Sequence, residues 1–205
     1  MAVFAETSAA LKLLALELIR IANDFRLLSS GPNTGLAEIN LPAVQPGSSI
    51  MPGKVNPVMA EVLDMVAFQV VGNDLTIGMA CQAGQLEINV MTPIIAFNLL
   101  QSLEIMKNAI KLFRERCVKG ITANEERCRQ LAERSLGMAT VLNRYLGYET
   151  AAKIARESLA TGRSVRELVV EKGLISTEQA SEIFNPIRLT QPGLVVRNRR
   201  RAEEK

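Results

Sequence analysis

The hydrophobic pattern predicts three long helices in the first 118 residues. Residues 7–28 contain no helix breaker, and their apolar positions cover most of a helix circumference, which is typical of a helix surrounded by neighbours. A second helix is expected to begin at Asn56 and Pro57, with Asn56 as its N-cap, and a third to run from Pro93 to about Cys117. Three long apolar helices cannot cover one another. The pattern therefore predicts a bundle that other chains or further sequence complete.

After Lys119 and Gly120 the pattern changes to short amphipathic segments separated by glycine and asparagine. Two of them start with a capping box, in which Ser164 or Ser176 is followed three residues later by Glu or Gln. Little alternation of apolar and polar residues supports strands, so the predicted fold class is all-α. The expected short helices are 124–135, 138–146, 149–160, 164–171 and 177–184.

This change in the sequence pattern divides the chain into three predicted parts. Residues 1–118 form a helical-bundle part, residues 119–187 a small all-helical domain, and residues 188–205 a charged tail. Between residues 30 and 57, glycine and proline interrupt any helical or strand periodicity, so this segment is predicted to be a long loop. Loops longer than about 12–15 residues are usually functional or disordered. Five apolar residues are expected to anchor this loop: Ile39, Leu41, Val44, Ile50 and Met51.

Composition excludes several classes of chemistry. The 205 residues include no histidine, which rules out a Ser-His-Asp triad or a histidine metal site within this chain. Three cysteines without a Cys-x-x-Cys pair argue against structural zinc or a disulfide framework. A net charge of +3 is too small to require nucleic acid or an acidic membrane as partner. With no long apolar run and no signal-peptide pattern, the cytoplasm is the expected location.

The candidate chemistry lies in the flexible loop 46–57, which contains the sequence GSSIMPGKVNP. Two hydroxyls, a cation and an amide lead directly into a helix N-terminus, where backbone N–H groups and Lys54 favour a carboxylate or phosphate. A nucleotide-binding P-loop does not fit, because five residues separate Gly47 from Gly53 and Val55 follows the lysine. On residue chemistry alone, an anion-binding loop and a plain helix-capping loop are equally good interpretations.

The pattern GSSxMPxKxNxxxxE resembles the signature of the aspartase/fumarase superfamily of homotetrameric lyases. The likeness extends over IANDFRLLSSGP, AGQLEINVMTP and GRSVRELVVEKGLIS, and so along nearly the whole chain. Members of that family are more than twice as long. The resemblance thus implies that residues 1–118 are the C-terminal part of the central helical domain. It also implies that each site combines residues from three subunits and that this chain carries only one part of it.

Within the superfamily, several details resemble the aspartase branch more than the class II fumarases. These are Gln45 before Pro-Gly, the run from Val58 to Ala60 before Glu61, and Gly-Gln-Leu at residues 84–86. The resemblance implies reversible deamination of L-aspartate to fumarate and ammonia, without a cofactor or a metal site. A fumarase, which adds water to the same small dicarboxylate, is the alternative. For these 205 residues alone, an inactive bundle or assembly module is the other reading.

The resemblance also assigns roles to residues of the loop. Ser48 matches the general base that removes a proton from carbon. Ser49 would contact the reacting carboxylate, while Lys54 and Asn56 would hold the other carboxylate. Gly47 and Met51 would support the loop. Glu61 would partner a cation or a histidine supplied from elsewhere, although a helix-surface acid near a positive dipole end explains it equally well.

Overall fold

The computed structural model describes residues 1–192, so residues 193–205 of the predicted tail lie outside the described residues. The chain divides into two compact units, the first from Met1 to Asn124 and the second beginning at Glu125. Helices dominate both units, which confirms the predicted all-α class.

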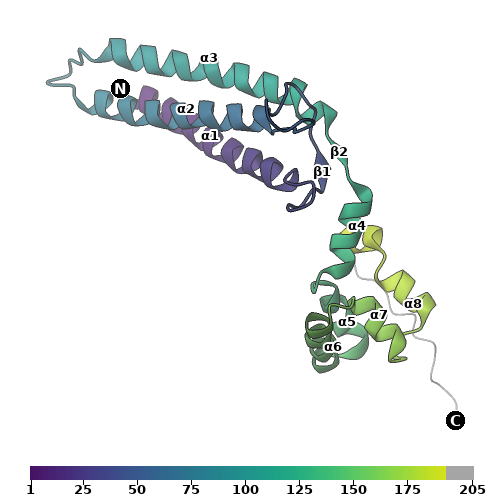
Figure 1. Cartoon of the computed structure of the whole chain (residues 1–205). Helices are drawn as coiled ribbons and strands as arrows, with labels where there is room; N and C mark the ends of the chain where they lie inside the picture. The colour runs from purple at the N-terminus through teal and green to yellow at the C-terminus, as the bar shows by residue number, and fades with distance from the viewer. Residues whose placement is uncertain (193–205) are drawn as a thin grey trace. The chain divides into compact units, whose positions relative to one another are not determined.

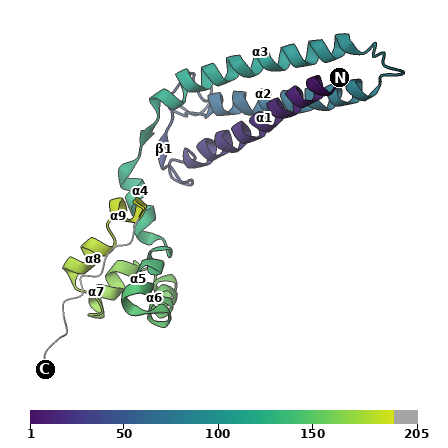
Figure 2. The same ribbon diagram turned by 180° about the vertical axis from the view of Figure 1, so that it is seen from behind.

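Three long helices build the first unit: α1 (Ala2–Leu28), α2 (Val58–Gln82) and α3 (Thr92–Arg116). Helix α2 lies beside both α1 and α3, and its turn into α3 forms the far end of the unit in both views (Figures 1 and 2). Small residues such as Ala15, Ala60 and Ala67 are fully buried where these helices meet, which lets the backbones approach closely. The helix positions match the pattern of the sequence.

Large apolar side chains remain exposed on all three helices. Within this chain α1 is not surrounded, because only Ser8, Ala15 and Ala22 of α1 are buried and Leu13 is 63% exposed. Completion of the bundle by other chains or further sequence stays a prediction. The physical reason is that α1 has neighbours on one side only. Helix α2 is long and apolar enough to cross a membrane by length and composition, a test that core helices of soluble proteins also pass.

Two short strands connect the long loop to the end of the bundle. Strand β1 (Ile39–Asn40) pairs antiparallel with β2 (Thr122–Ala123), which follows a short 3-10 turn, η1 (Val118–Gly120). The backbone N–H of Asn124 adds a hydrogen bond of 2.8 Å to the carbonyl of Glu38. Strands of two residues leave no alternation to detect, which is why the sequence pattern missed them.

The second unit packs short helices around one apolar core that includes Leu142, Leu168 and Val169. Both predicted capping boxes are present, at Ser164 and Ser176. A final short helix was not predicted, and the Asn185 side chain accepts N–H bonds at its start. The helices of this unit are α4 (Glu125–Arg134), α5 (Met138–Leu146), α6 (Tyr148–Thr161), α7 (Val165–Glu171), α8 (Thr177–Ile183) and α9 (Pro186–Thr190).

Candidate functional site

The loop before α2 is closed by its own hydrogen bonds. The N–H of Gly47 donates to the carbonyl of Lys54 at 3.0 Å, and the amide Nδ2 of Asn56 donates to the carbonyl of Gly47 at 2.6 Å. The predicted N-cap is therefore wrong: α2 begins after Pro57 without a side-chain cap, because the Asn56 amide is engaged by the loop. The result is a ring of backbone that brings residues 47 and 54 together.

Glycine at position 47 is required by this closure. A Cβ atom there would lie 2.2 Å from the carbonyl oxygen of Lys54, which is far inside van der Waals contact with backbone. Gly53 is different, because it adopts a left-handed backbone with φ +78° in open space. The two glycines thus allow, respectively, the close approach and the turn of the same loop.

The hydroxyl of Ser48 receives two backbone N–H donors from its own loop. The N–H groups of Ile50 and Met51 lie 3.1 Å and 3.0 Å from Ser48 Oγ, and the side chain is half-buried. Donors in this arrangement would strengthen their bonds to the oxygen if it became negative. The two loop amides that surround this hydroxyl are therefore those of Ile50 and Met51.

A pocket of about 440 Å³ lies at this loop and is lined by residues between Ala43 and Val55. Ser48, Met51 and Lys54 line it, so the loop brings the candidate base and the candidate cation to one cavity. The ammonium group of Lys54 has no ion-pair partner within residues 1–192. Gly47 lines the pocket as well, whereas the remaining predicted site residues, Ser49, Asn56 and Glu61, do not.

Only part of the predicted anchoring of the loop is present. Ile39 sits in strand β1, and Leu41 packs against the core cluster between the long helices. The expectation is wrong for Val44, Met51 and above all Ile50, which is 86% exposed. Within residues 1–192, these three side chains remain exposed. Among the described residues, no group of three or more His, Cys, Asp or Glu side chains could hold a metal ion.

An ion pair with a buried carboxylate joins α1 to α2 near the two ends of the loop. Arg26, near the end of α1, donates from Nη1 to Oδ2 of Asp64 on α2 at 3.1 Å. The Asp64 side chain is 4% exposed, and its Oδ1 has no hydrogen-bond partner among the described residues. Burial raises the pKa of this carboxyl, and the charge and hydrogen bond of Arg26 offset that effect only in part. Glu61 adds a further rise.

The Asp64→Asn substitution is expected to raise the free energy of unfolding at pH 7 by about 1 kcal/mol. A neutral amide gives up less hydration free energy on burial than a carboxylate does. The raised pKa means that the folded chain binds the proton more tightly than the unfolded chain. The stability that Asp64 contributes is therefore fully present below its pKa in the unfolded chain and is lost as pH rises through its pKa in the folded chain. Urea titrations across this pH range should show that the variant lacks this loss.

Asp74 provides the matched control on the same helix. Its burial would raise its pKa, but hydrogen bonds from Lys12 and Ser8 at 2.5 Å and 2.7 Å outweigh burial, and the pKa is lowered. Stability from this group is present above the unfolded pKa and is lost as pH falls through the folded pKa. Asp74→Asn should therefore lower stability at pH 7. Equal effects of the two substitutions would contradict this account.

Comparisons with known proteins agree with the resemblance carried by the loop. The chain is 57% identical over 194 residues to an aspartate ammonia-lyase of Bacillus sp and 55% identical over 191 residues to that of Bacillus subtilis. These matches cover 95% and 93% of this chain. A family model described as Lyase matches residues 2–72, and one described as Fumarase C C-terminus matches residues 138–191.

The chain is thus similar to aspartate ammonia-lyases along nearly its whole length.

Solved structures extend this similarity to the fold. A fumarate lyase:delta crystallin from Brucella melitensis, bound to cobalt, matches with a TM-score of 0.88 and 49% identity, over 92% of this chain and 41% of that one. A class II fumarase from Schistosoma mansoni matches with a TM-score of 0.86 and 41% identity, over 94% of this chain and 40% of that one. The chain spans only 42% and 40% of the length of the two Bacillus relatives.

Proposed function

We propose that this chain is the part of an aspartate ammonia-lyase that carries the catalytic loop. The complete enzyme would convert L-aspartate reversibly to fumarate and ammonia in the cytoplasm. The observation that carries the proposal is 57% identity to a Bacillus aspartate ammonia-lyase over 95% of the chain. The closed loop with Ser48 and Lys54 at one pocket supports it.

In this proposal Ser48 is the general base. The reaction needs removal of a weakly acidic proton from the carbon next to a carboxylate, and a serine hydroxyl is a poor base unless its oxyanion is stabilised. The N–H groups of Ile50 and Met51 are positioned to stabilise that charge, because both already donate hydrogen bonds to Ser48 Oγ. Donors fixed before the reaction need no reorganisation when the charge develops, which is where such groups contribute most.

The two carboxylates of the substrate would be held by the other polar groups of the loop. Ser49 is exposed and free to contact the carboxylate that accepts the carbanion's charge. Lys54 lines the pocket and supplies the positive charge for the second carboxylate. Asn56 donates to the carbonyl of Gly47 here, so it would contact substrate only after exchanging that bond. The proposed order of events is thus binding at Lys54 first and rearrangement of the loop afterwards.

Glu61 is proposed to act from outside the pocket. It lies on α2, half-buried, one turn beyond the start of the helix. A carboxylate there can hold a cationic group supplied by another segment or subunit. The complete enzyme is proposed to be a homotetramer whose sites combine three subunits, so we expect the isolated 205 residues to be an inactive assembly module. The exposed apolar faces of α1, α2 and α3 support this proposal.

Assays with two substrates test the reaction. The complete protein that contains this chain should form fumarate from L-aspartate, and L-malate should give none. A class II fumarase is the second candidate, favoured by the 41% identity to the Schistosoma mansoni enzyme. Fumarate formed from malate alone would replace our proposal by that candidate. Turnover of aspartate by the purified 205-residue chain would contradict the proposed inactivity of the fragment.

The Lys54→Met substitution is expected to raise KM for aspartate about tenfold in the complete enzyme, because a charge-assisted hydrogen bond to a carboxylate is removed. The methionine keeps the length of the side chain but not its charge. Steady-state kinetics measure the change. The control is Lys153→Met on helix α6 in the second unit, which removes the same charge from an exposed site and should leave KM unchanged. A change in kcat alone would contradict a binding role.

A further inference from the structure

Asp64 is the buried charged group that the proposed reaction does not use. Its Oδ2 accepts a hydrogen bond from Arg26 at 3.1 Å, while Oδ1 is buried without a partner among the described residues. A buried acceptor left unpaired costs about 1–3 kcal/mol, and more when the group is charged. A carboxylate in this state is therefore poised to take up a proton.

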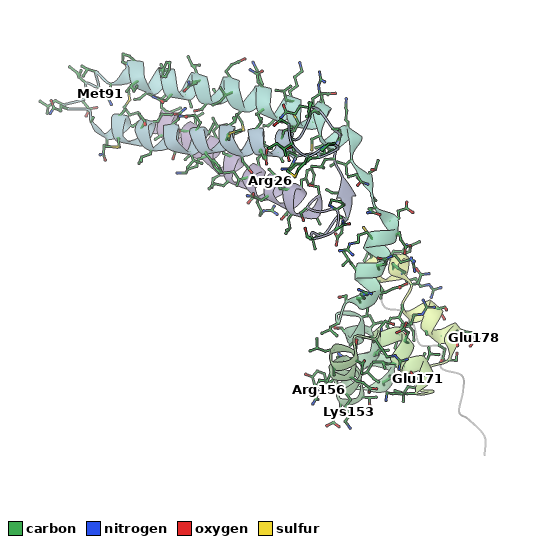
Figure 3. All side chains as sticks on the ribbon, viewed as in Figure 1. Arg26, Met91, Lys153, Arg156, Glu171 and Glu178 are labelled. Carbon is green, nitrogen blue, oxygen red and sulfur yellow. The ribbon has the colours of Figure 1, made fainter. Side chains whose placement is uncertain are left out.

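The pair joins the two ends of the loop segment 29–57. Arg26 precedes the start of that segment by three residues, and Asp64 follows its end by seven. Figure 3 labels Arg26 on α1, close to where the loop begins. Between these ends, Leu41 packs on the cluster that contains Ala60 and Leu63, so the first half of the loop is held at the same place. A change at this pair therefore affects both ends of the loop segment 29–57.

The charges around Asp64 come from few groups. From α1, Arg26 reaches it, and the same nitrogen of Arg26 also donates to Oδ1 of Asn23 at 2.8 Å. From α2, Glu61 acts on it unfavourably. Phe113 of α3 and Cys117, the residue after that helix, belong to the neighbouring cluster, and burial raises the pKa of the Cys117 thiol. Arg26 is thus the cation that favours the ionised form of Asp64.

We propose that the Arg26–Asp64 pair is a proton-sensitive latch that holds the two ends of the loop segment 29–57 together. When Asp64 is ionised, Arg26 is fixed between Asp64 and Asn23. When Asp64 takes up a proton it stays buried on α2, and Arg26, which is already 43% exposed, turns to water because the attraction is lost. A buried Asp64 without its cation has a higher pKa than the paired one, so acidification favours this released form even though it also stabilises the fold. The loop then opens more often. This inference does not depend on which dicarboxylate the enzyme uses.

Hydrogen exchange on the 205-residue chain tests the latch. The amides of Gly47 and Lys54, both hydrogen-bonded in the closed loop, report its opening. After correction for intrinsic exchange, opening should increase roughly two- to tenfold on acidification from about pH 8 towards the carboxyl range. Asp64→Asn keeps an acceptor for Arg26 but cannot titrate, so its loop opening should be independent of pH. Arg26→Gln should open more often at every pH.

The matched control is Arg20→Gln, which removes an arginine of the same helix from an exposed pair with Glu17. It should behave like the unsubstituted chain. If Arg26→Gln fails to fold by circular dichroism, Arg26→Lys replaces it and should show intermediate opening. The proposal is overturned if Asp64→Asn retains the pH dependence, or if loss of Arg26 leaves loop exchange unchanged. Neither outcome depends on the aspartate assay, so the latch and the proposed function can fail separately.

Discussion

Ser48→Ala in the complete enzyme is expected to reduce kcat by about 10²- to 10⁴-fold, the usual contribution of a positioned general base. Alanine removes the oxygen that the N–H groups of Ile50 and Met51 stabilise, and no other group of the loop replaces it. Both N–H groups lie on the exposed part of the loop, so water can satisfy them. The proposed tetramer and its thermal stability should therefore be preserved. Steady-state kinetics and sedimentation measure the two outcomes.

Ser49→Ala is the natural comparison for this substitution. The neighbouring hydroxyl is exposed and receives no N–H group of the loop, so its loss should weaken substrate binding more than it slows proton removal. A parallel experiment exchanges the transferred hydrogen of aspartate for deuterium. The isotope effect on kcat should grow in any Ser48 variant with residual activity. Retention of activity within tenfold after Ser48→Ala would show that another group is the base.

Local patterns predicted most of the fold. The boundaries of α5 agree with the expected 138–146, and the capping boxes at Ser164 and Ser176 form as predicted, because these signals act over three or four neighbouring residues. Asn56 shows the limit of such signals. Its amide could cap α2, but the carbonyl of Gly47, nine residues away, binds it instead. A tertiary contact thus replaced a favourable local one.

The sequence could name candidate site residues, but it could not predict their contacts. The motif identified Ser48 and Lys54, and the structure brings both to one pocket. Apolar character alone predicted that Ile50 and Met51 anchor the loop, whereas they are exposed and contribute through backbone N–H groups. The Arg26–Asp64 pair was also invisible in sequence, because it joins residues 38 positions apart on different helices. Such pairing depends on how the helices pack.

Gly47→Ala is expected to lower kcat/KM in the complete enzyme by roughly 5- to 150-fold, which corresponds to the about 1–3 kcal/mol that an inserted methyl costs in a packed site. The new Cβ would lie 2.2 Å from the carbonyl oxygen of Lys54. Because that atom is backbone, the ring closed by the bond between residues 47 and 54 must open. The pocket would then lose the arrangement in which Ser48 and Lys54 both line it.

Gly53→Ala separates this loss of closure from a general intolerance of the loop. Its φ of +78° makes any side chain strained by about 1–2 kcal/mol, yet a Cβ there meets no atom within 4 Å. The ring between residues 47 and 54 can therefore stay closed, and exchange of the Gly47 amide should remain slow in this variant. In Gly47→Ala the exchange of residue 47 should be fast, and activity should fall further. A larger loss of activity in Gly53→Ala than in Gly47→Ala would contradict this account. It would show that the backbone conformation of the turn, rather than the close approach at Gly47, determines the active form of the loop.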